Sequence, residues 1–249
     1  MTAPAARFAG TLARIFPEYG RIGLAVSGGA DSTAMLLLAH QAIPGQFEVA
    51  TVDHGLRAAA EQECALVAHL CAERGIPCTV LRATVAPGNV QAEARKGRYA
   101  VLAHWAQARG LAAVATAHQA DDQAETLLLR LARGSGVAGL AGVRERGLVP
   151  GSSLPLLRPM LGFTRAECAE IVATAGIDPV CDPSNEDDRF DRVRMRQLLA
   201  AMPLGSAQGV LATASGLVFH GNSAGTIFAR DSDTGEVLWQ VETGSTIMA

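Results

Sequence analysis

The sequence predicts an α/β fold class: a doubly wound parallel sheet with helices on both faces, followed by a short β-rich C-terminal tail. Between Arg21 and about Ala115, short apolar runs rich in β-formers alternate with longer helical stretches, as in parallel strands joined by crossover helices. Beyond Pro203 the helical periodicity ends, and short β-type runs alternate with Gly, Ser, Asn and Asp turns. We therefore expect a nucleotide-binding domain over residues 1–203 and a separate tail over residues 204–249.

The expected elements follow from the local periodicity of apolar residues. Strands are predicted at Ile22–Val26, Phe47–Val52, Cys78–Leu81 and Ala112–Ala115. Helices are predicted near Ser32–Gln41, Ala58–Arg74, Val90–Arg109, Asp121–Leu131 and Thr164–Ala175. The last helix has a capping-box spacing, because Glu167 stands three residues after Thr164. Four short tail strands are predicted at Val210–Ala212, Leu217–His220, Thr226–Arg230 and Val237–Val241.

The composition is that of a globular protein with one main core. The chain has 249 residues, of which 49% are hydrophobic and 18% charged. It contains no run of eighteen apolar residues and no secretory signal, which predicts a cytoplasmic protein without a membrane partner. The five cysteines form no CxxC pair, so neither a disulfide framework nor a structural zinc site is expected. A net charge of −3 means that any polyanion must be met by local arginine clusters.

The first candidate site is the segment from Ser27 to Ser32 (SGGADS), which follows the first strand and opens a helix. Adjacent glycines allow backbone N–H groups to converge on an anion, and the helix N-terminus adds partial positive charge. No Gly-Lys-Ser/Thr follows, so this is not a Walker A loop. The alternative is an ordinary turn capped by Asp31 or Ser32. Phosphate binding is the favoured interpretation.

Two more polar segments follow later strands. Asp53 and His54 end the second strand, in a position typical of a nucleotide pocket, although a structural turn would explain them equally well. After the fourth strand, His118, Asp121 and Asp122 are candidates for holding Mg²⁺ or orienting a reacting group. Taken alone, helix capping by one of the two aspartates is the commoner explanation.

Basic residues gather in two places, at Arg95 to Arg98 beside Tyr99 and at Arg192 to Arg196. Either group suits the phosphates of ATP or RNA, while a solvated helix face is the ordinary alternative. The segment Gly134–Gly139 satisfies GxGxxG but follows a helix instead of a strand, so we reject dinucleotide binding there.

In their order, these segments resemble the tRNA(Ile)-lysidine synthetase family of PP-loop ATP pyrophosphatases over about residues 20–203. The resemblance rests on SGGADS, VDHGLR, QAEARKGRY, TAHQADDQAETLLLRLARGSGVAGLAG, Arg158-Pro159, DPSN at 182–185 and RVRMR. It implies a ligase that uses ATP and Mg²⁺ to adenylate the wobble cytidine (position 34) of tRNA(Ile) with a CAU anticodon at C2. Free L-lysine then displaces AMP. A homo-oligomer is left open.

The resemblance also implies roles for individual residues. The expected ATP-binding residues are Ser27, Gly28, Gly29, Ala30, Asp31, Ser32, Asp53, His54 and Arg57. The expected catalytic residues are Asp31, His118, Asp121, Asp122, Arg95 and Arg98, with Asp31 and Asp122 as Mg²⁺ ligands. Arg95 and Arg98 would hold phosphates as charge develops in the transition state. The sequence departs from the family at Gln119, where many members have histidine, and at Val193, where many have asparagine.

Residues 205–249 resemble instead one blade of a quinoprotein-type β-propeller, through GVLAT, GLVF and DSDTGEVLW. A single blade cannot close a propeller, so we expect a fused, poorly packed tail or one that pairs with another chain.

Two alternative functions of the chain remain open from the sequence. One is another PP-loop enzyme, such as a tRNA cytidine thiolase, although that family's paired cysteines are absent from the sequence. The other is an inactive nucleotide-binding remnant or assembly module, which lysine transfer to tRNA would exclude.

Overall fold

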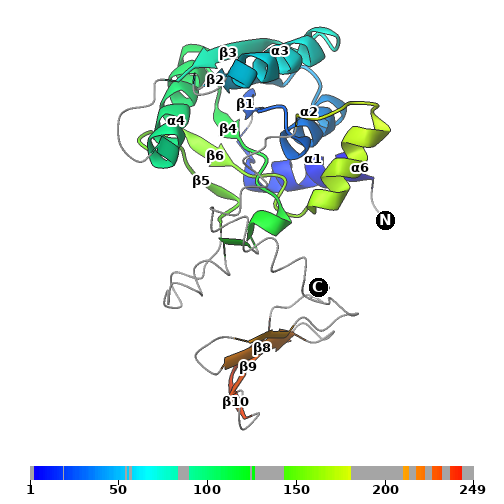
Figure 1. Cartoon of the computed structure of the whole chain (residues 1–249), viewed down its shortest axis with the longest axis vertical. Helices are drawn as coiled ribbons and strands as arrows, with labels where there is room; N and C mark the ends of the chain where they lie inside the picture. The colour runs from blue at the N-terminus through cyan, green and yellow to red at the C-terminus, as the bar shows by residue number, and fades with distance from the viewer. Residues whose placement is uncertain are drawn as a thin grey trace. The chain divides into compact units, whose positions relative to one another are not determined.

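The computed structural model describes residues 3–18, 20–53, 55, 58–83, 90–123, 125–126, 143–180, 210–212, 217–221, 226–231 and 236–242. The chain divides into two compact units (Figure 1). The first consists of Met1–Leu127 and Val137–Asp187, and the second of Leu128–Gly136 and Asp188–Ala249. The predicted domain boundary at residue 203 lies outside the described residues and stays a prediction.

The first unit is built on a six-stranded sheet with the order β3-β2-β1-β4-β6-β5. Its strands are β1 (Ile22–Ala25), β2 (Phe47–Asp53), β3 (Cys78–Arg82), β4 (Ala113–Ala115), β5 (Arg146–Leu148) and β6 (Pro155–Leu157). All neighbours pair in parallel except β5, which runs antiparallel to β6 at the edge. The chain moves outward from β1 to β3 and then crosses to β4 on the other side of β1. The sheet therefore has its topological switch point between β1 and β4, where ligands bind in such folds.

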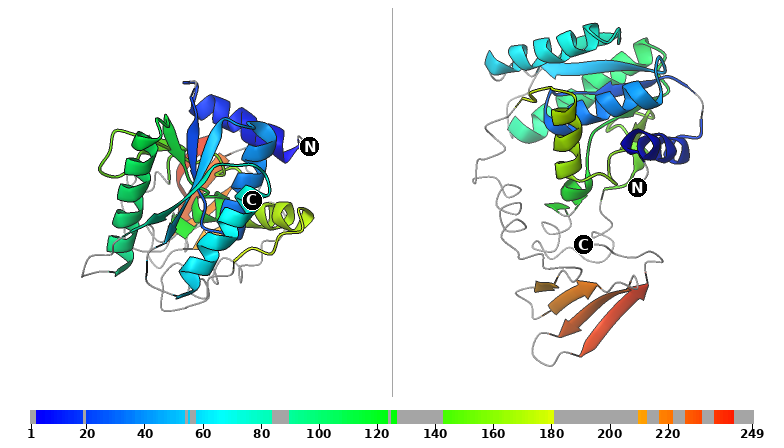
Figure 2. Two further views of the ribbon diagram at one scale, coloured as in Figure 1. Left: turned by 90° about the horizontal axis from the view of Figure 1, so that it is seen from above. Right: turned by 90° about the vertical axis from the view of Figure 1, so that its right-hand side faces the viewer.

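Helices cover both faces of this sheet (Figure 2). They are α1 (Pro4–Ile15), α2 (Ala30–Ala42), α3 (Ala58–Ala72), α4 (Val90–Ala108) and α6 (Arg165–Thr174), and residues 120–123 and 125–126 are also helical. One core cluster joins α1, α2, α3 and α6 to the sheet, and a second joins α4 to the opposite face. The doubly wound fold is confirmed. Within the described part of the chain, no helix is long and apolar enough to cross a membrane.

The predicted elements agree with the structure to within a few residues, with three omissions. Helix α1 was not predicted, although its buried Phe8, Leu12 and Ile15 have helical spacing. Strands β5 and β6 were also missed, because three residues are too few to show an alternating pattern. The capping box of α6 is present: the Thr164 hydroxyl accepts the Glu167 N–H, and the Glu167 carboxylate accepts the Thr164 N–H. The predicted helix Asp121–Leu131 lies largely outside the described residues.

The second unit contains a four-stranded antiparallel sheet with the order β10-β9-β8-β7. Its strands are β7 (Val210–Ala212), β8 (Leu217–Gly221), β9 (Thr226–Asp231) and β10 (Val237–Glu242). Strands at all four predicted tail positions are confirmed, and neighbours in sequence are neighbours in the sheet. The register of β10 shifts between Val237 and Trp239. The resemblance to a propeller blade stays a prediction.

Candidate active site at the carboxyl ends of β1 and β4

The loop between β1 and α2 is held in shape by its own hydroxyl groups. The Ser27 N–H donates to Ser32 Oγ (3.1 Å), and Ser32 Oγ donates to the Gly29 carbonyl (3.0 Å). The Gly28 carbonyl accepts both the Thr33 hydroxyl (3.3 Å) and the Val180 N–H (2.9 Å). The loop carbonyls of Gly28 and Gly29 are thus occupied by the protein itself, which leaves the N–H side of the loop as its binding surface.

That N–H side forms an anion cradle. Among the described residues, the backbone N–H groups of Gly28, Gly29, Ala30 and Asp31 have no hydrogen-bond acceptor. Gly28 has a φ of +89°, and a Cβ there would lie 3.2 Å from Val180 Cγ2, so only glycine fits without strain. Free N–H groups at a helix N-terminus favour negatively charged oxygens. The residues present therefore fit the phosphates of ATP, as the sequence predicted.

Asp31 places a poorly compensated carboxylate beside the cradle. It lies in the first turn of α2, and its Oδ1 is buried without a hydrogen-bond partner in the described structure. Burial raises the pKa of the Asp31 carboxyl, and the charges of Asp122 and Asp121 raise it further, against the opposing effects of Arg165 and Gln119. The three aspartates predicted from two separate motifs are thus brought together. Such a concentration of negative charge suits a cation.

The segment after β4 is organised by Gln119, which is fully buried. Its Oε1 accepts the Asp121 N–H (2.6 Å), and its own N–H donates to Asp122 Oδ2 (3.0 Å). Asp122 therefore does cap the following helical turn, the alternative considered from the sequence, while it also contributes charge to Asp31. Gln119 Nε2 is buried without a partner in the described residues. His118 lies nearby, with Nδ1 2.9 Å from the Thr116 hydroxyl.

Helix α6 contributes Arg165, a site residue that the sequence did not indicate. The Arg165 N–H donates to Asp121 Oδ2 (2.9 Å), and its Nη2 lies 3.3 Å from Oε1 of the buried Glu125. The adjacent Phe163 carbonyl accepts the Ala120 N–H (2.8 Å). These contacts join segments 40 to 44 residues apart, and no local pattern could reveal them. The capping box marks where α6 begins but not what it docks against.

The other predicted residues lie around this centre or outside the described structure. Asp53 accepts the Gly55 N–H (2.8 Å) at the end of β2, which is the structural turn considered from the sequence. Arg95 and Arg98 lie on α4, each with its guanidinium carbon 5.4 Å from the centre of the Tyr99 ring. His54 and Arg57 lie outside the described residues, as do Arg192, Arg194 and Arg196.

The model of the PP-loop domain family matches residues 4–202. A tRNA(Ile)-lysidine synthase of Novosphingobium aromaticivorans is 51% identical over 219 residues, which are 87% of this chain and 67% of that protein. The chain belongs to the tRNA(Ile)-lysidine synthase family of PP-loop proteins. Because residues 1–203 make up less than 87% of the chain, this match extends into the predicted tail.

Further relatives support the membership of this family. The tRNA(Ile)-lysidine synthases of Zymomonas mobilis and Ruegeria pomeroyi are 48% and 47% identical, over 75% and 74% of this chain. The chain spans 58% and 45% of the length of these two relatives. Among solved structures, the U34-tRNA thiolase NcsA from Methanococcus maripaludis with its [4Fe-4S] cluster has a TM-score of 0.60 at 16% identity, over 80% of each chain. That likeness concerns the fold alone.

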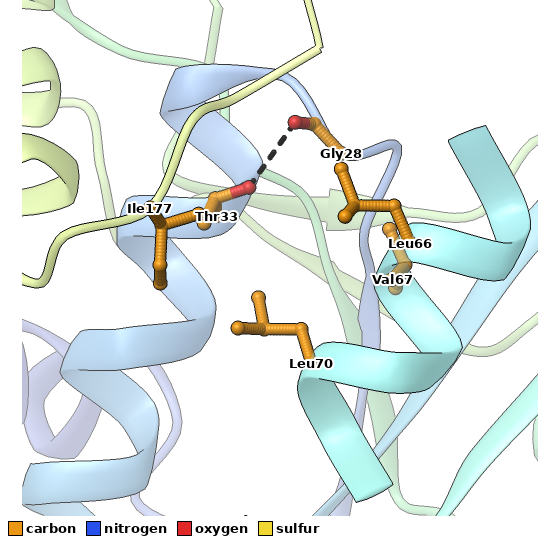
Figure 3. Close-up of a pocket in the computed structure, with 6 residues that line it drawn as sticks. All are labelled: Gly28, Thr33, Leu66, Val67, Leu70 and Ile177. Atoms are coloured by element: carbon orange, nitrogen blue, oxygen red, sulfur yellow. Dashed lines mark hydrogen bonds between the residues drawn. The ribbon is translucent and has the colours of Figure 1, made fainter. Parts of the chain in front are cut away.

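A small apolar cavity lies behind the loop of this PP-loop protein (Figure 3). It measures about 20 Å³ and is lined by Gly28, Thr33, Leu66, Val67, Leu70 and Ile177. A space of this size holds a water molecule, not a nucleotide, so it is not the ATP site. Within the described residues, no group of three or more His, Cys, Asp and Glu side chains is placed to hold a metal ion. Mg²⁺ would here need oxygens from phosphate or water besides the carboxylates, which is its usual arrangement.

Proposed function

We propose that this chain attaches lysine to C2 of the wobble cytidine of tRNA(Ile), in two steps that consume ATP. In the first step the base oxygen on C2 takes the AMP group of ATP, and pyrophosphate leaves. In the second step an amine of free L-lysine attacks C2, loses a proton and displaces AMP together with that oxygen. The observation that carries the proposal is the free N–H cradle at Gly28–Asp31 beside the Asp31 carboxylate, whose Oδ1 has no hydrogen-bond partner among the described residues.

The loop residues hold the triphosphate in this proposal. The N–H groups of Gly28 to Asp31 bind phosphate oxygens, and the partial charge of α2 stabilises them. Asp31 and Asp122 would hold Mg²⁺, since Asp31 Oδ1 has no partner among the described residues and burial, with the charges of Asp122 and Asp121, raises the pKa of the Asp31 carboxyl. Mg²⁺ supplies charge neutralisation at the phosphates as pyrophosphate leaves. Arg95 and Arg98 on α4 bind phosphate oxygens from the other face of the sheet.

The segment after β4 positions the lysine amine. His118, Asp121 and Asp122 stand at the switch point next to the ATP loop, where a nucleophile can approach the activated base. A carboxylate close to an amine holds it by a charge-assisted hydrogen bond, and a neutral imidazole accepts a proton from it. Arg165 keeps Asp121 in place through its backbone N–H. We therefore assign proton acceptance to His118 and amine binding to the aspartates.

The tRNA(Ile) substrate agrees with the names of the relatives, whereas the CAU anticodon and free L-lysine are finer parts of the proposal. A cytoplasmic location and self-association stay predictions. The inactive-remnant alternative is not favoured, because 47–51% identity to named synthases extends over most of the chain.

Lysine transfer tests the proposal directly. The purified chain is incubated with ATP, Mg²⁺, labelled L-lysine and a CAU-anticodon tRNA(Ile) transcript, and label in the tRNA is counted. Asp31→Ala should abolish transfer, and Glu170→Ala, which removes an exposed carboxylate on α6, should leave it unchanged. Absence of transfer by the unmodified chain while ATP still binds would refute the proposed reaction and favour the remnant.

A further inference from the structure

Arg158 extends from β6 toward the side of the sheet that α4 covers. Leu156 packs in the α4 core cluster and Leu157 in the opposite one, so alternation along the strand directs Arg158 to the α4 side. The backbone is still extended there, because the Arg158 N–H donates to the Glu145 carbonyl (2.8 Å). Ala115 of β4 pairs with Leu157, which puts Arg158 level with Thr116 at the carboxyl edge. Arg158 thus reaches the edge where the candidate site lies.

Three arginines, Arg95, Arg98 and Arg158, gather at this point, and the described residues form no ion pair with them. Arg158 donates to the Arg144 carbonyl through Nη1 (2.7 Å), but its Nε is buried without a partner among the described residues, as is Nε of Arg98. Burial lowers the pKa of the Arg158 guanidinium; Tyr99 opposes this effect, and the positive charge of Arg95 adds to it. Each of these features favours an anion.

Tyr99 supplies a further donor at the same place. Its side chain is 1% exposed, and Arg95 and Arg98 lie over its ring. Its buried hydroxyl lies close enough to Arg158 to raise the pKa of that guanidinium, but it has no hydrogen-bond partner of good geometry in the described residues. A buried hydroxyl without a partner destabilises a folded protein, so its presence calls for an explanation. An oxyanion that accepts from this hydroxyl and from the two Nε groups would provide one.

We propose that Arg158 and the Tyr99 hydroxyl complete, with Arg95 and Arg98, a binding site for one phosphate group. We refer to these four residues as the α4–β6 phosphate site. A phosphate offers several acceptor oxygens in different directions, which matches guanidinium forks and a hydroxyl that converge from a helix and a strand. The inference deepens the proposed function and rests on it for the source of the phosphate, either ATP or the tRNA backbone.

The α4–β6 phosphate site is separate from the cradle at Gly28–Asp31. It follows β6, which lies two strands from β1 in the sheet, and neighbouring strands are about 4.8 Å apart. A phosphate held here is therefore about 10 Å across the sheet from the loop. The two sites can bind different phosphates at once, and Arg158 is the residue that defines the second.

The test uses Tyr99→Phe, because its two expected effects have opposite directions. Loss of an unpartnered hydroxyl should leave the melting temperature unchanged or raised, while phosphate binding weakens about fivefold. Arg158→Met should weaken phosphate binding about tenfold. Arg158→Lys should recover part of this binding, because lysine restores the positive charge but not the two parallel N–H donors of the guanidinium. Arg146→Gln removes an exposed arginine that pairs with Glu18 and should bind as the unmodified chain does.

Two probes identify the source of the phosphate in the full chain. One is inorganic pyrophosphate, measured by calorimetry, and the other is the tRNA(Ile) transcript, measured over a range of salt concentrations. Weaker pyrophosphate binding by the Tyr99 and Arg158 variants assigns the site to ATP. If the slope of their tRNA affinity against salt concentration is instead lowered by about one, the site belongs to the tRNA backbone. Unchanged binding of both probes to Tyr99→Phe and Arg158→Lys would overturn the inference, even if Arg158→Met fails to fold. Lysine transfer by the unmodified chain is scored separately, so a failure of the proposed reaction remains distinguishable.

Discussion

Two carboxylates in the same sheet domain have opposite surroundings. Glu48 on β2 is 1% exposed and accepts hydrogen bonds from Arg21 (2.6 Å) and from Nε and Nη2 of Arg109 (2.8 and 3.0 Å). The Arg109 hydrogen bond is the main reason why the pKa of Glu48 is lowered. Asp31, at the switch point, has an unpartnered Oδ1 and two aspartate neighbours, and its pKa is raised.

The degree to which the protein compensates a carboxylate distinguishes a structural charge, such as that of Glu48, from a charge with a proposed function, such as that of Asp31. A buried carboxylate that arginines neutralise stays ionised and joins elements of the fold, as Glu48 joins β2 to the ends of neighbouring segments. A carboxylate that the protein leaves uncompensated costs stability, and such groups concentrate at functional sites. The protein therefore compensates Asp31 less completely than Glu48, and in the proposed function a bound cation would supply the rest.

The largest effect is expected from Asp31→Asn, which removes the charge but keeps the shape. Lysine transfer should fall on the order of 10³-fold, because in the proposed function this charge holds Mg²⁺ at the phosphates. The free energy of unfolding should not fall, since burial and the charges of Asp122 and Asp121 disfavour the ionised carboxylate that the substitution removes. Rates of lysine transfer and urea unfolding, measured on the same preparation, check the predicted loss of activity and the predicted stability. A large loss of stability would contradict the functional assignment of Asp31.

Glu48→Gln should have the opposite effect to Asp31→Asn, because it should lower stability and leave activity unchanged. It leaves Arg21 and Arg109 without a counter-charge and should lower the free energy of unfolding by about 2 kcal/mol. This value is below that of a fully buried pair, because the arginine side chains are 48% and 52% exposed. Lysine transfer per folded molecule should be unchanged. Urea unfolding gives the stability, and reduced transfer at full folding would show that Glu48 also serves the site.

Arg165→Met should have a smaller effect, about a tenfold fall in kcat/KM for lysine. The backbone N–H to Asp121 remains, but the contact with Glu125 and the charge that lowers the pKa of Asp31 are lost. Arg165→Lys should restore most of the activity if charge is what matters. A uniform loss in both variants with an unchanged pH profile would indicate a purely structural role for Arg165.

The smallest effect concerns pH. The folded pKa of Glu48 is lowered from 4.5, so its ion pairs stabilise the protein above the unfolded pKa, and this contribution is lost as the pH falls through the folded value. The difference in unfolding free energy between the unmodified chain and Glu48→Gln should therefore be constant well above pH 4.5 and shrink as the pH falls below 4.5. Urea unfolding at several pH values measures it. A constant difference at low pH would mean that charge is not its cause.

The sequence by itself determined the local parts of this protein. The loop between β1 and α2 could be placed from a strand, two glycines and a helix start, and the capping box of α6 from Thr164 and Glu167. Such features depend on steric limits and hydrogen bonds within a few residues, so local periodicity and spacing report them. The grouping of Asp31 with Asp121 and Asp122 was also predictable, because parallel strands end at one edge.

Only the tertiary structure decided which distant side chains complete or compensate these parts. Arg109 reaches Glu48 across 61 positions, Arg165 reaches Glu125 across 40, and Arg158 joins the α4 arginines only because β6 pairs with β4. The helical spacing of α1 can be recognised in the sequence, but the residues that α1 packs against cannot be predicted from it. The physical reason is that such contacts depend on how helices and strands pack, and packing is a property of the whole chain that no short segment encodes.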